Sequence, residues 1–278
     1  MPPSLSHPAN AASPGPNEVT FREAVFSGYR TGALDILVRN RRVISVPSQI
    51  GCRVGCGFCI SKGTPVVRNL RAEEMLELVR KCLDAFPADG RPLELSFTGE
   101  GEPLLNWRET RRVMQGLESF SGDFDSVRYC FSGLGASRLL STVEPGPYPV
   151  RLQFSLHAAR QSVRDSLVPR SESLEVILAA LRANQHRFAS LELNVVLQDG
   201  VNDSEQDLAA LVHWGDPSWP VLLNPLLSDG EERIADRTSE FEQRLLHAGR
   251  QVKRYSKIAS RISRNCVYPL MSARRQVP

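Results

Sequence analysis

The chain of 278 residues is long enough to bury a full hydrophobic core, and its composition is that of an ordinary globular protein. It contains no apolar run near the roughly 18 residues of a membrane span. The N-terminus also lacks the basic start and apolar centre of an export signal. These features argue against a membrane partner and favour a cytoplasmic location.

Positive charge is concentrated in two stretches, although the net charge is only +3. Residues 36–72 and 251–278 contain no acidic residue and carry seven Lys or Arg each, which leaves −11 for the rest of the chain. This asymmetry predicts one face that binds a polyanion, most simply a nucleic acid. Scattered, solvated arginine is the alternative interpretation.

Residues 1–18 are rich in Pro, Ser and Ala and are predicted to be a disordered tail before a core of residues 19–278. Helical and strand-like apolar patterns then alternate along the chain. Helices are predicted at 72–86, 107–118, 174–186, 205–213 and 241–249. Strands are predicted before Cys52 and at 93–97, 127–131, 150–155, 191–197, 219–224 and 251–257.

This alternation predicts parallel strands joined by right-handed crossovers. About six βα units can be counted, fewer than the eight of a closed barrel. We therefore expect an α/β fold, a partial (β/α)6 TIM-like barrel. Active sites of such folds gather at the carboxyl ends of the strands, where each motif below is placed.

Three cysteines lie within eight residues, with a phenylalanine just before the third: Cys52, Cys56 and Cys59. Three thiolates can bind three irons of a cubane iron–sulfur cluster. No fourth cysteine is nearby, so the fourth iron would stay open to a small molecule. A structural zinc site is the alternative, but it normally needs four ligands and the other three cysteines stand alone.

The CxxxCxΦC spacing resembles that of radical S-adenosylmethionine (SAM) enzymes, in which SAM occupies the open iron. The segment Gly99–Asn106, GEGEPLLN, follows a predicted strand and is similar to GMGEPLLN of the RlmN/Cfr family of RNA adenine methyltransferases. Further segments resemble that family in the same order. They are SQIGC at 48–52, RNL at 68–70, SLH at 155–157, VRDSLVP at 163–169 and LQDGVND at 197–203.

The resemblance implies a radical SAM fold, a [4Fe–4S] cluster on the three cysteines, and SAM as the second cofactor. It also implies an electron donor such as flavodoxin or ferredoxin. The implied SAM contacts are Gly101, Glu102, Cys130, Ser155, Leu156, His157 and Asn224. Cys130 stands where the family has a serine. For His157, a hydrogen-bonded structural role is the alternative to SAM positioning.

In the family, a C-terminal cysteine takes a methyl group from one SAM and passes it, as a methylene radical, to an adenine carbon. Cys266 is the matching residue, and its basic neighbours favour the thiolate. A buried free thiol is the alternative. Asp35 is the nearest match to the family's proton acceptor, three positions out of register. Ser45 replaces the family's resolving cysteine, and a hydroxyl cannot form the disulfide that releases the product.

Three functions remain open. The first is a radical SAM methyltransferase that modifies an adenine of rRNA or tRNA through Cys266. The second is an enzyme of the same lineage with altered chemistry or a small-molecule substrate. The third is a non-catalytic iron–sulfur RNA-binding protein, against which the intact GEGEP and SLH segments argue. The 42 residues before Val43 have no counterpart of the family's accessory domain, so RNA contacts are expected from the core.

Overall fold

The computed structural model describes residues 18–254, apart from 39, 88, 121–123, 145 and 229–230. A nine-stranded sheet forms the centre of the fold, in the order β1-β2-β3-β6-β7-β8-β9-β10-β13. Its strands are β1 (Glu18–Phe26), β2 (Tyr29–Val38), β3 (Arg41–Val46), β6 (Leu93–Phe97), β7 (Phe124–Phe131), β8 (Val150–Ser155), β9 (Ser190–Val196), β10 (Val221–Asn224) and β13 (Val252–Arg254).

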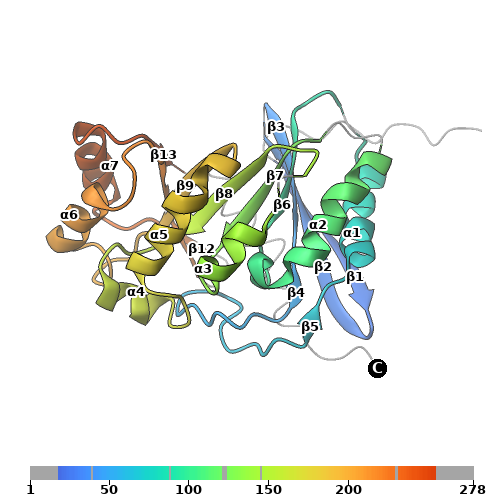
Figure 1. Ribbon diagram of the computed structural model, residues 1–278, viewed down its shortest axis with the longest axis horizontal. Coiled ribbons are helices and arrows are strands. Elements are labelled where there is room, and N and C mark those ends of the chain that lie inside the picture. Colours follow the sequence, from blue (N-terminus) through green and yellow to red (C-terminus); the bar gives the residue numbers. More distant parts are fainter. Residues whose placement is uncertain are drawn as a thin grey trace, which may run out of the picture.

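Within this sheet, the seven strands β3, β6, β7, β8, β9, β10 and β13 run parallel to one another. Each of them except β13 is followed by at least one helix before the next, which gives six βα units and a last strand. The helices are α1 (Ala72–Ala85), α2 (Trp107–Gly116), α3 (Ala136–Leu139), α4 (Gln161–Leu167), α5 (Leu174–Asn184), α6 (Glu205–His213) and α7 (Thr238–His247). Figure 1 shows α2, α3 and α5 packed in front of the central strands. The predicted partial barrel is confirmed.

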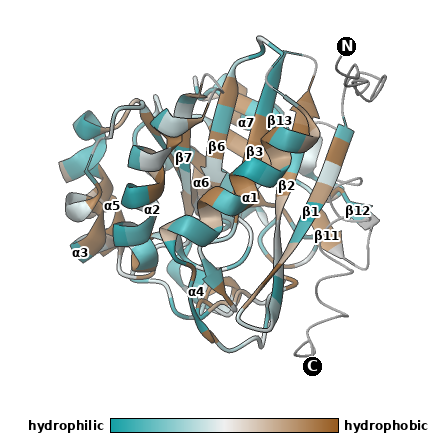
Figure 2. Ribbon diagram, turned by 90° about the vertical axis from the view of Figure 1, so that its right-hand side faces the viewer, coloured by the Kyte–Doolittle hydropathy of each residue, from teal (hydrophilic) through white to brown (hydrophobic). Residues whose placement is uncertain are grey.

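Alternating side chains give each parallel strand an apolar face and a polar face. In β8, Val150, Leu152 and Phe154 are buried in the core, whereas Arg151 and Gln153 lie on the opposite, inner face of the barrel. The helices cover the apolar face and turn their hydrophilic sides outward, as the teal surfaces of α1 and α2 in Figure 2 show. The inner face is left to line a cavity.

Local sequence explains where several helices begin. The Ser173 hydroxyl accepts a hydrogen bond from the Val176 amide at the start of α5. Ser204 and Asp207 form a reciprocal capping box at the start of α6. Both satisfy amides that have no partner within the helix.

The antiparallel hairpin of β1 and β2 was not predicted. The hairpin extends the sheet beyond β3. Glu18 pairs with Leu37 within it, so Glu18 is part of the folded domain rather than of the tail predicted for residues 1–18. Residues 1–17 lie outside the described part of the chain. No helix among the described residues is long and apolar enough to cross a membrane.

A buried ion pair joins β2, β3 and α1. Asp35 and Arg42 are 1% and 2% exposed, and the guanidinium donates to both carboxylate oxygens at 2.7 and 2.8 Å. Arg42 also donates to the carbonyl oxygens of Cys82 and Phe86, at 2.9 and 2.6 Å. The pair therefore lies on the helix-covered face of the sheet, where it fixes the C-terminal end of α1.

Replacing Asp35 with alanine is expected to lower the free energy of unfolding by about 3–5 kcal/mol, because it leaves a buried guanidinium without its counter-ion. Urea denaturation measures this loss. Glu23→Ala is the matched control, since Glu23 pairs with Arg30 at the surface and should cost at most about 1 kcal/mol. Equal losses for the two variants would contradict the role given to Asp35.

Candidate functional site: a cysteine loop beside a barrel cavity

The three cysteines lie in the loop between two short strands, β4 (Gln49–Ile50) and β5 (Arg68–Asn69). Gly51 starts the loop with φ +85°, and a Cβ there would lie 2.0 Å from the Pro65 carbonyl oxygen, so only glycine fits. The loop packs on the segment after β8: the Gly57 amide donates to the Leu167 carbonyl oxygen at 2.9 Å, and Val54 is 2% exposed.

All three cysteines lack a disulfide bond and face one cavity. Burial, followed by charge repulsion from Cys59 and Cys52, raises the pKa of Cys56 to about 12. Burial likewise raises the pKa of Cys52. The metal-free thiols of Cys52 and Cys56 are therefore protonated at neutral pH, and a cationic group must bind to stabilise them as thiolates.

The cysteines fit a cluster better than a single ion. Within the described ranges, no three Cys, His, Asp or Glu side chains are placed to hold one metal ion. A cubane cluster instead takes one thiolate at each of three separate irons. The Ser61 amide donates to the Cys59 sulfur at 3.4 Å, a contact typical of thiolate ligands. Cys52, Cys56 and Cys59 would therefore hold a [4Fe–4S] cluster and leave one iron open.

The GEGEP loop after β6 lies beside Cys52. Gly101 has φ +96°, and a Cβ would lie 2.7 Å from the Gln49 side chain, so the backbone comes unusually close to the cysteine loop. Glu102 is 1% exposed and accepts hydrogen bonds from the Ser132 amide and hydroxyl at 2.7 and 2.6 Å. Burial raises its pKa to about 7, against the lowering effect of Ser132. Glu102 thus ties this loop to the end of β7.

His157 closes the end of β8 in a left-handed conformation, with φ 54°. Its Nδ1 accepts a hydrogen bond from the Val196 amide at 3.2 Å, and its ring packs edge-on against Phe58 with centroids 4.7 Å apart. Burial, followed by the charge of Arg164, lowers its pKa well below the usual value. His157 is therefore neutral and orients the cavity wall without acting as an acid.

Arg164 of α4 is a structural residue of the site that the sequence analysis did not identify. It is fully buried and donates to the carbonyl oxygens of Ser155, Leu156 and Ser132. Burial lowers its pKa to about 10, so the guanidinium stays charged at neutral pH. No carboxylate among the described residues forms an ion pair with it. The only signal in the sequence was an arginine inside the largely apolar VRDSLVP segment.

The cavity has two adjoining lobes. The first, of about 430 Å³, is here called the cofactor lobe because it contains the three cysteines, Gly101, Glu102, Ser155 and His157. The second, of about 470 Å³, extends toward the amino ends of the strands and is called the inner lobe. Ser45, Cys59 and Cys130 line both lobes.

The structure thus brings most of the predicted site residues together. Asn224 lines the inner lobe, where its Nδ2 donates to the Asn194 side chain and its buried Oδ1 has no hydrogen-bond partner. Leu156 does not line the cavity with its side chain, which is buried in the core. Its carbonyl oxygen supports the site by accepting a hydrogen bond from Arg164 at 2.6 Å.

Of the two predicted catalytic residues, the structure describes only Asp35, and Asp35 does not line the cavity. Asp35 points to the helix-covered face of the sheet, where Arg42 neutralises it, so it is not placed to accept a proton from a substrate. The alternation of β2 explains the difference, since its neighbours Leu34 and Ile36 are the residues that face the cavity. Cys266 lies outside the described residues.

Replacing Arg164 with methionine is expected to lower the free energy of unfolding by about 3–5 kcal/mol, because three buried carbonyl groups lose their donor. Urea denaturation of the metal-free protein measures this loss. Arg160→Met at the N-cap of the same helix is the control, since Arg160 is one-third exposed and pairs with Asp207 at 3.2 Å; it should cost about 1 kcal/mol or less. A small loss at Arg164 would contradict its role.

Comparison with known proteins agrees with this geometry. A Dual-specificity RNA methyltransferase RlmN of Anaeromyxobacter is 35% identical over 183 residues, which covers 62% of this chain and 48% of that protein. A Probable dual-specificity RNA methyltransferase RlmN of Rhodopirellula baltica is 33% identical over 205 residues, covering 66% and 55%. This chain thus spans about half the length of the curated relatives that it matches.

Among solved structures, a radical SAM methyltransferase from Sphaerobacter thermophilus aligns with a TM-score of 0.75 and 27% identity. The alignment covers 89% of this chain and 80% of that one. The sequence profile of the Radical SAM superfamily matches residues 46–212, which include the cysteine loop and the strand ends around the cofactor lobe. The chain therefore belongs to the radical SAM superfamily, whose members bind a [4Fe–4S] cluster and SAM.

Proposed function

We propose that this protein is a radical SAM methyltransferase that modifies an adenine of rRNA or tRNA. The observation that carries the proposal is that three cysteines, the Gly101 backbone and the Ser155–His157 turn line one lobe, which opens into a second. The relatives at 33–35% identity are named as RNA methyltransferases, which supports RNA as the substrate class.

Each residue of the cofactor lobe has a role in this proposal. Cys52, Cys56 and Cys59 would hold the [4Fe–4S] cluster and leave one iron open for SAM. With an electron donor such as flavodoxin or ferredoxin, the cluster and SAM would supply the radical chemistry of the reaction. The Gly101 backbone and the Ser155–His157 turn orient SAM, while the apolar ring of Phe58 helps to keep water out.

The proposed methyl carrier is Cys266. Its sulfur would form a bond to the methyl carbon of one SAM as the sulfonium–methyl bond breaks and S-adenosylhomocysteine leaves. A carrier is needed because C2 and C8 of adenine are too electron-poor to attack SAM themselves. The basic residues around Cys266 in the sequence favour the thiolate that this transfer requires.

Two observations favour a second candidate, an enzyme of the same lineage with a small-molecule substrate. The Ser45 hydroxyl lines both lobes and donates to the Thr98 carbonyl oxygen at 3.4 Å, so no thiol occupies the resolving position. In addition, two arginines of the first basic stretch are paired with buried carboxylates: Arg42 with Asp35, and Arg68 with Glu74. Fewer charges are then left for an RNA backbone.

Mass spectrometry separates the two candidates. If the first is correct, protein incubated anaerobically with SAM carries a methyl group on Cys266, and Cys266→Ser abolishes it. Total rRNA and tRNA from a deletion strain then lack one methyladenosine that wild-type cells contain. Cys82→Ser is the control and should leave both methylations unchanged, since Cys82 lies on the buried face of α1, away from the cavity. An unmodified Cys266 together with unchanged RNA would contradict the first candidate.

A further inference from the structure

The inner lobe has a floor of charged side chains, which is unusual for the inside of a barrel, where branched apolar residues normally fill the space. The lobe is large enough for a small ligand and opens toward Ser45, Cys59 and Cys130, which it shares with the cofactor lobe. A ligand bound in it would lie directly beside the proposed reaction centre.

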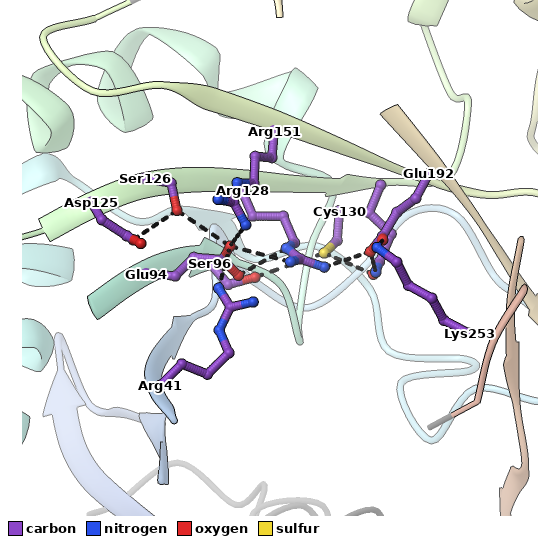
Figure 3. Close-up of polar contacts among 11 residues, drawn as sticks. Arg41, Glu94, Ser96, Asp125, Ser126, Arg128, Cys130, Arg151, Glu192 and Lys253 are labelled. Carbon is purple, nitrogen blue, oxygen red and sulfur yellow. Dashed lines mark hydrogen bonds and ion pairs between the residues drawn. The ribbon is translucent and has the colours of Figure 1, made fainter. Parts of the chain in front are cut away.

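Glu94 is the centre of this floor. Its carboxylate is 2% exposed and contacts three guanidinium groups, those of Arg41 at 2.9 Å, Arg128 at 2.8 Å and Arg151 at 3.5 Å. The Ser126 hydroxyl donates to it at 3.4 Å. Figure 3 shows these side chains converging on Glu94 from neighbouring strands.

Glu192 is the second carboxylate of the floor. Arg128 contacts it at 2.6 Å, Lys253 at 2.8 Å, and the Gln153 amide donates to it at 2.6 Å. Burial alone would raise the pKa of Glu192, but Arg128 and Lys253 lower it overall, so the carboxylate is ionised at neutral pH.

Positive charge is in excess on this floor. Arg41, Arg128 and Glu94 line the lobe itself, while Arg151, Glu192 and Lys253 lie behind this lining. In the whole cluster, the four cations share the two carboxylates of Glu94 and Glu192. Asp125 stands at the exposed edge and accepts from the Ser126 hydroxyl at 2.9 Å; even when it is included, one positive charge remains. A cleft with apolar walls strengthens the electrostatic potential of such charges, so the lobe attracts an anion.

Arg41 also has an unused donor. Its Nε is buried and makes no hydrogen bond, although the residue lines the inner lobe. A buried N–H group without a partner costs free energy unless a ligand or water accepts from it. The Arg41 side chain is 30% exposed and holds Glu94 through Nη2, so it can keep this contact while other N–H groups of the same guanidinium donate to an oxygen atom inside the lobe.

The walls of the lobe are apolar. Ile36 and Val38 of β2 form one side, and Leu222 and Leu227, in β10 and β11 (Leu226–Ser228), form another. A flat aromatic ring fits between such walls, with its charged group directed to the floor. The lobe thus suits a ligand that combines a ring with an oxyanion.

We propose that the inner lobe is a substrate site in which Arg41 and the charged floor bind the phosphate of a nucleotide. The base then lies between the apolar walls, next to Cys130 and Ser45. The identity of the ligand as a nucleotide rests on the proposed function, whereas the preference for an oxyanion rests on the floor alone. The phosphate belongs either to the RNA strand or to a free nucleotide.

The test compares AMP with adenosine in calorimetric titrations of the reconstituted protein at saturating SAM, which keeps both ligands out of the cofactor lobe. We expect AMP to bind about tenfold more tightly than adenosine, with a preference that falls as salt is added. Arg41→Gln should remove most of this preference and leave adenosine binding unchanged. Glu94 keeps Arg128 and Arg151 as partners in that variant, so the fold is preserved.

Two further variants complete the design. Arg151→Gln removes a partly exposed charge that contacts Glu94 from behind the lining of the lobe; it should also weaken AMP binding, and it replaces Arg41→Gln if that variant does not fold. Arg112→Gln on the outer surface of α2 should bind AMP as the wild type does. Equal affinities for AMP and adenosine, or a preference that survives both floor substitutions, would overturn the proposal.

Competition with a short adenine-containing RNA identifies the source of the phosphate. Displacement of AMP by the RNA supports the site and places the phosphate in the RNA strand. An AMP preference that the RNA does not affect also supports the site, but it contradicts the RNA substrate of the proposed function. Failure of the charged floor and failure of the RNA hypothesis are therefore distinguishable.

Discussion

The buried guanidinium of Arg164 is the interaction on which the site depends. It holds the carbonyl groups of Ser155 and Leu156 at the end of β8 together with that of Ser132 after β7, and Ser132 in turn holds Glu102. The segment that follows Arg164 supports the cysteine loop through the Gly57 amide. One charged side chain thus links the ends of β7 and β8 with the GEGEP segment and the cysteine loop, although no carboxylate in the described part of the chain forms an ion pair with it.

This arrangement also explains why a cluster suits the lobe. Burial and mutual repulsion keep the metal-free thiols of Cys52 and Cys56 protonated, so they lose their protons only when a strongly cationic group binds. A core of charge 2+ with three thiolates has a net charge of −1, which becomes −2 on reduction. The charge of Arg164 acts on Cys56 and favours both negative states.

Much of the fold follows from local patterns. The alternation of strand and helix predicts the six βα units, and the cysteine spacing and GEGEP segment predict the cofactor lobe, because each signal lies within a few neighbouring residues. The position of Asp35 could not be predicted, since a shift of one residue along a strand moves a side chain to the opposite face. The charged floor was equally hidden: Glu94, Arg128 and Glu192 come from three different strands and meet only through the sheet register.

The central claim is that Cys52, Cys56 and Cys59 leave one iron of a [4Fe–4S] cluster open for SAM. Electron paramagnetic resonance of the reduced, anaerobically reconstituted protein tests it most directly. The account predicts about four irons per chain and a cluster signal whose g-values shift when SAM is added. A signal that SAM leaves unchanged, at full iron content, would contradict it.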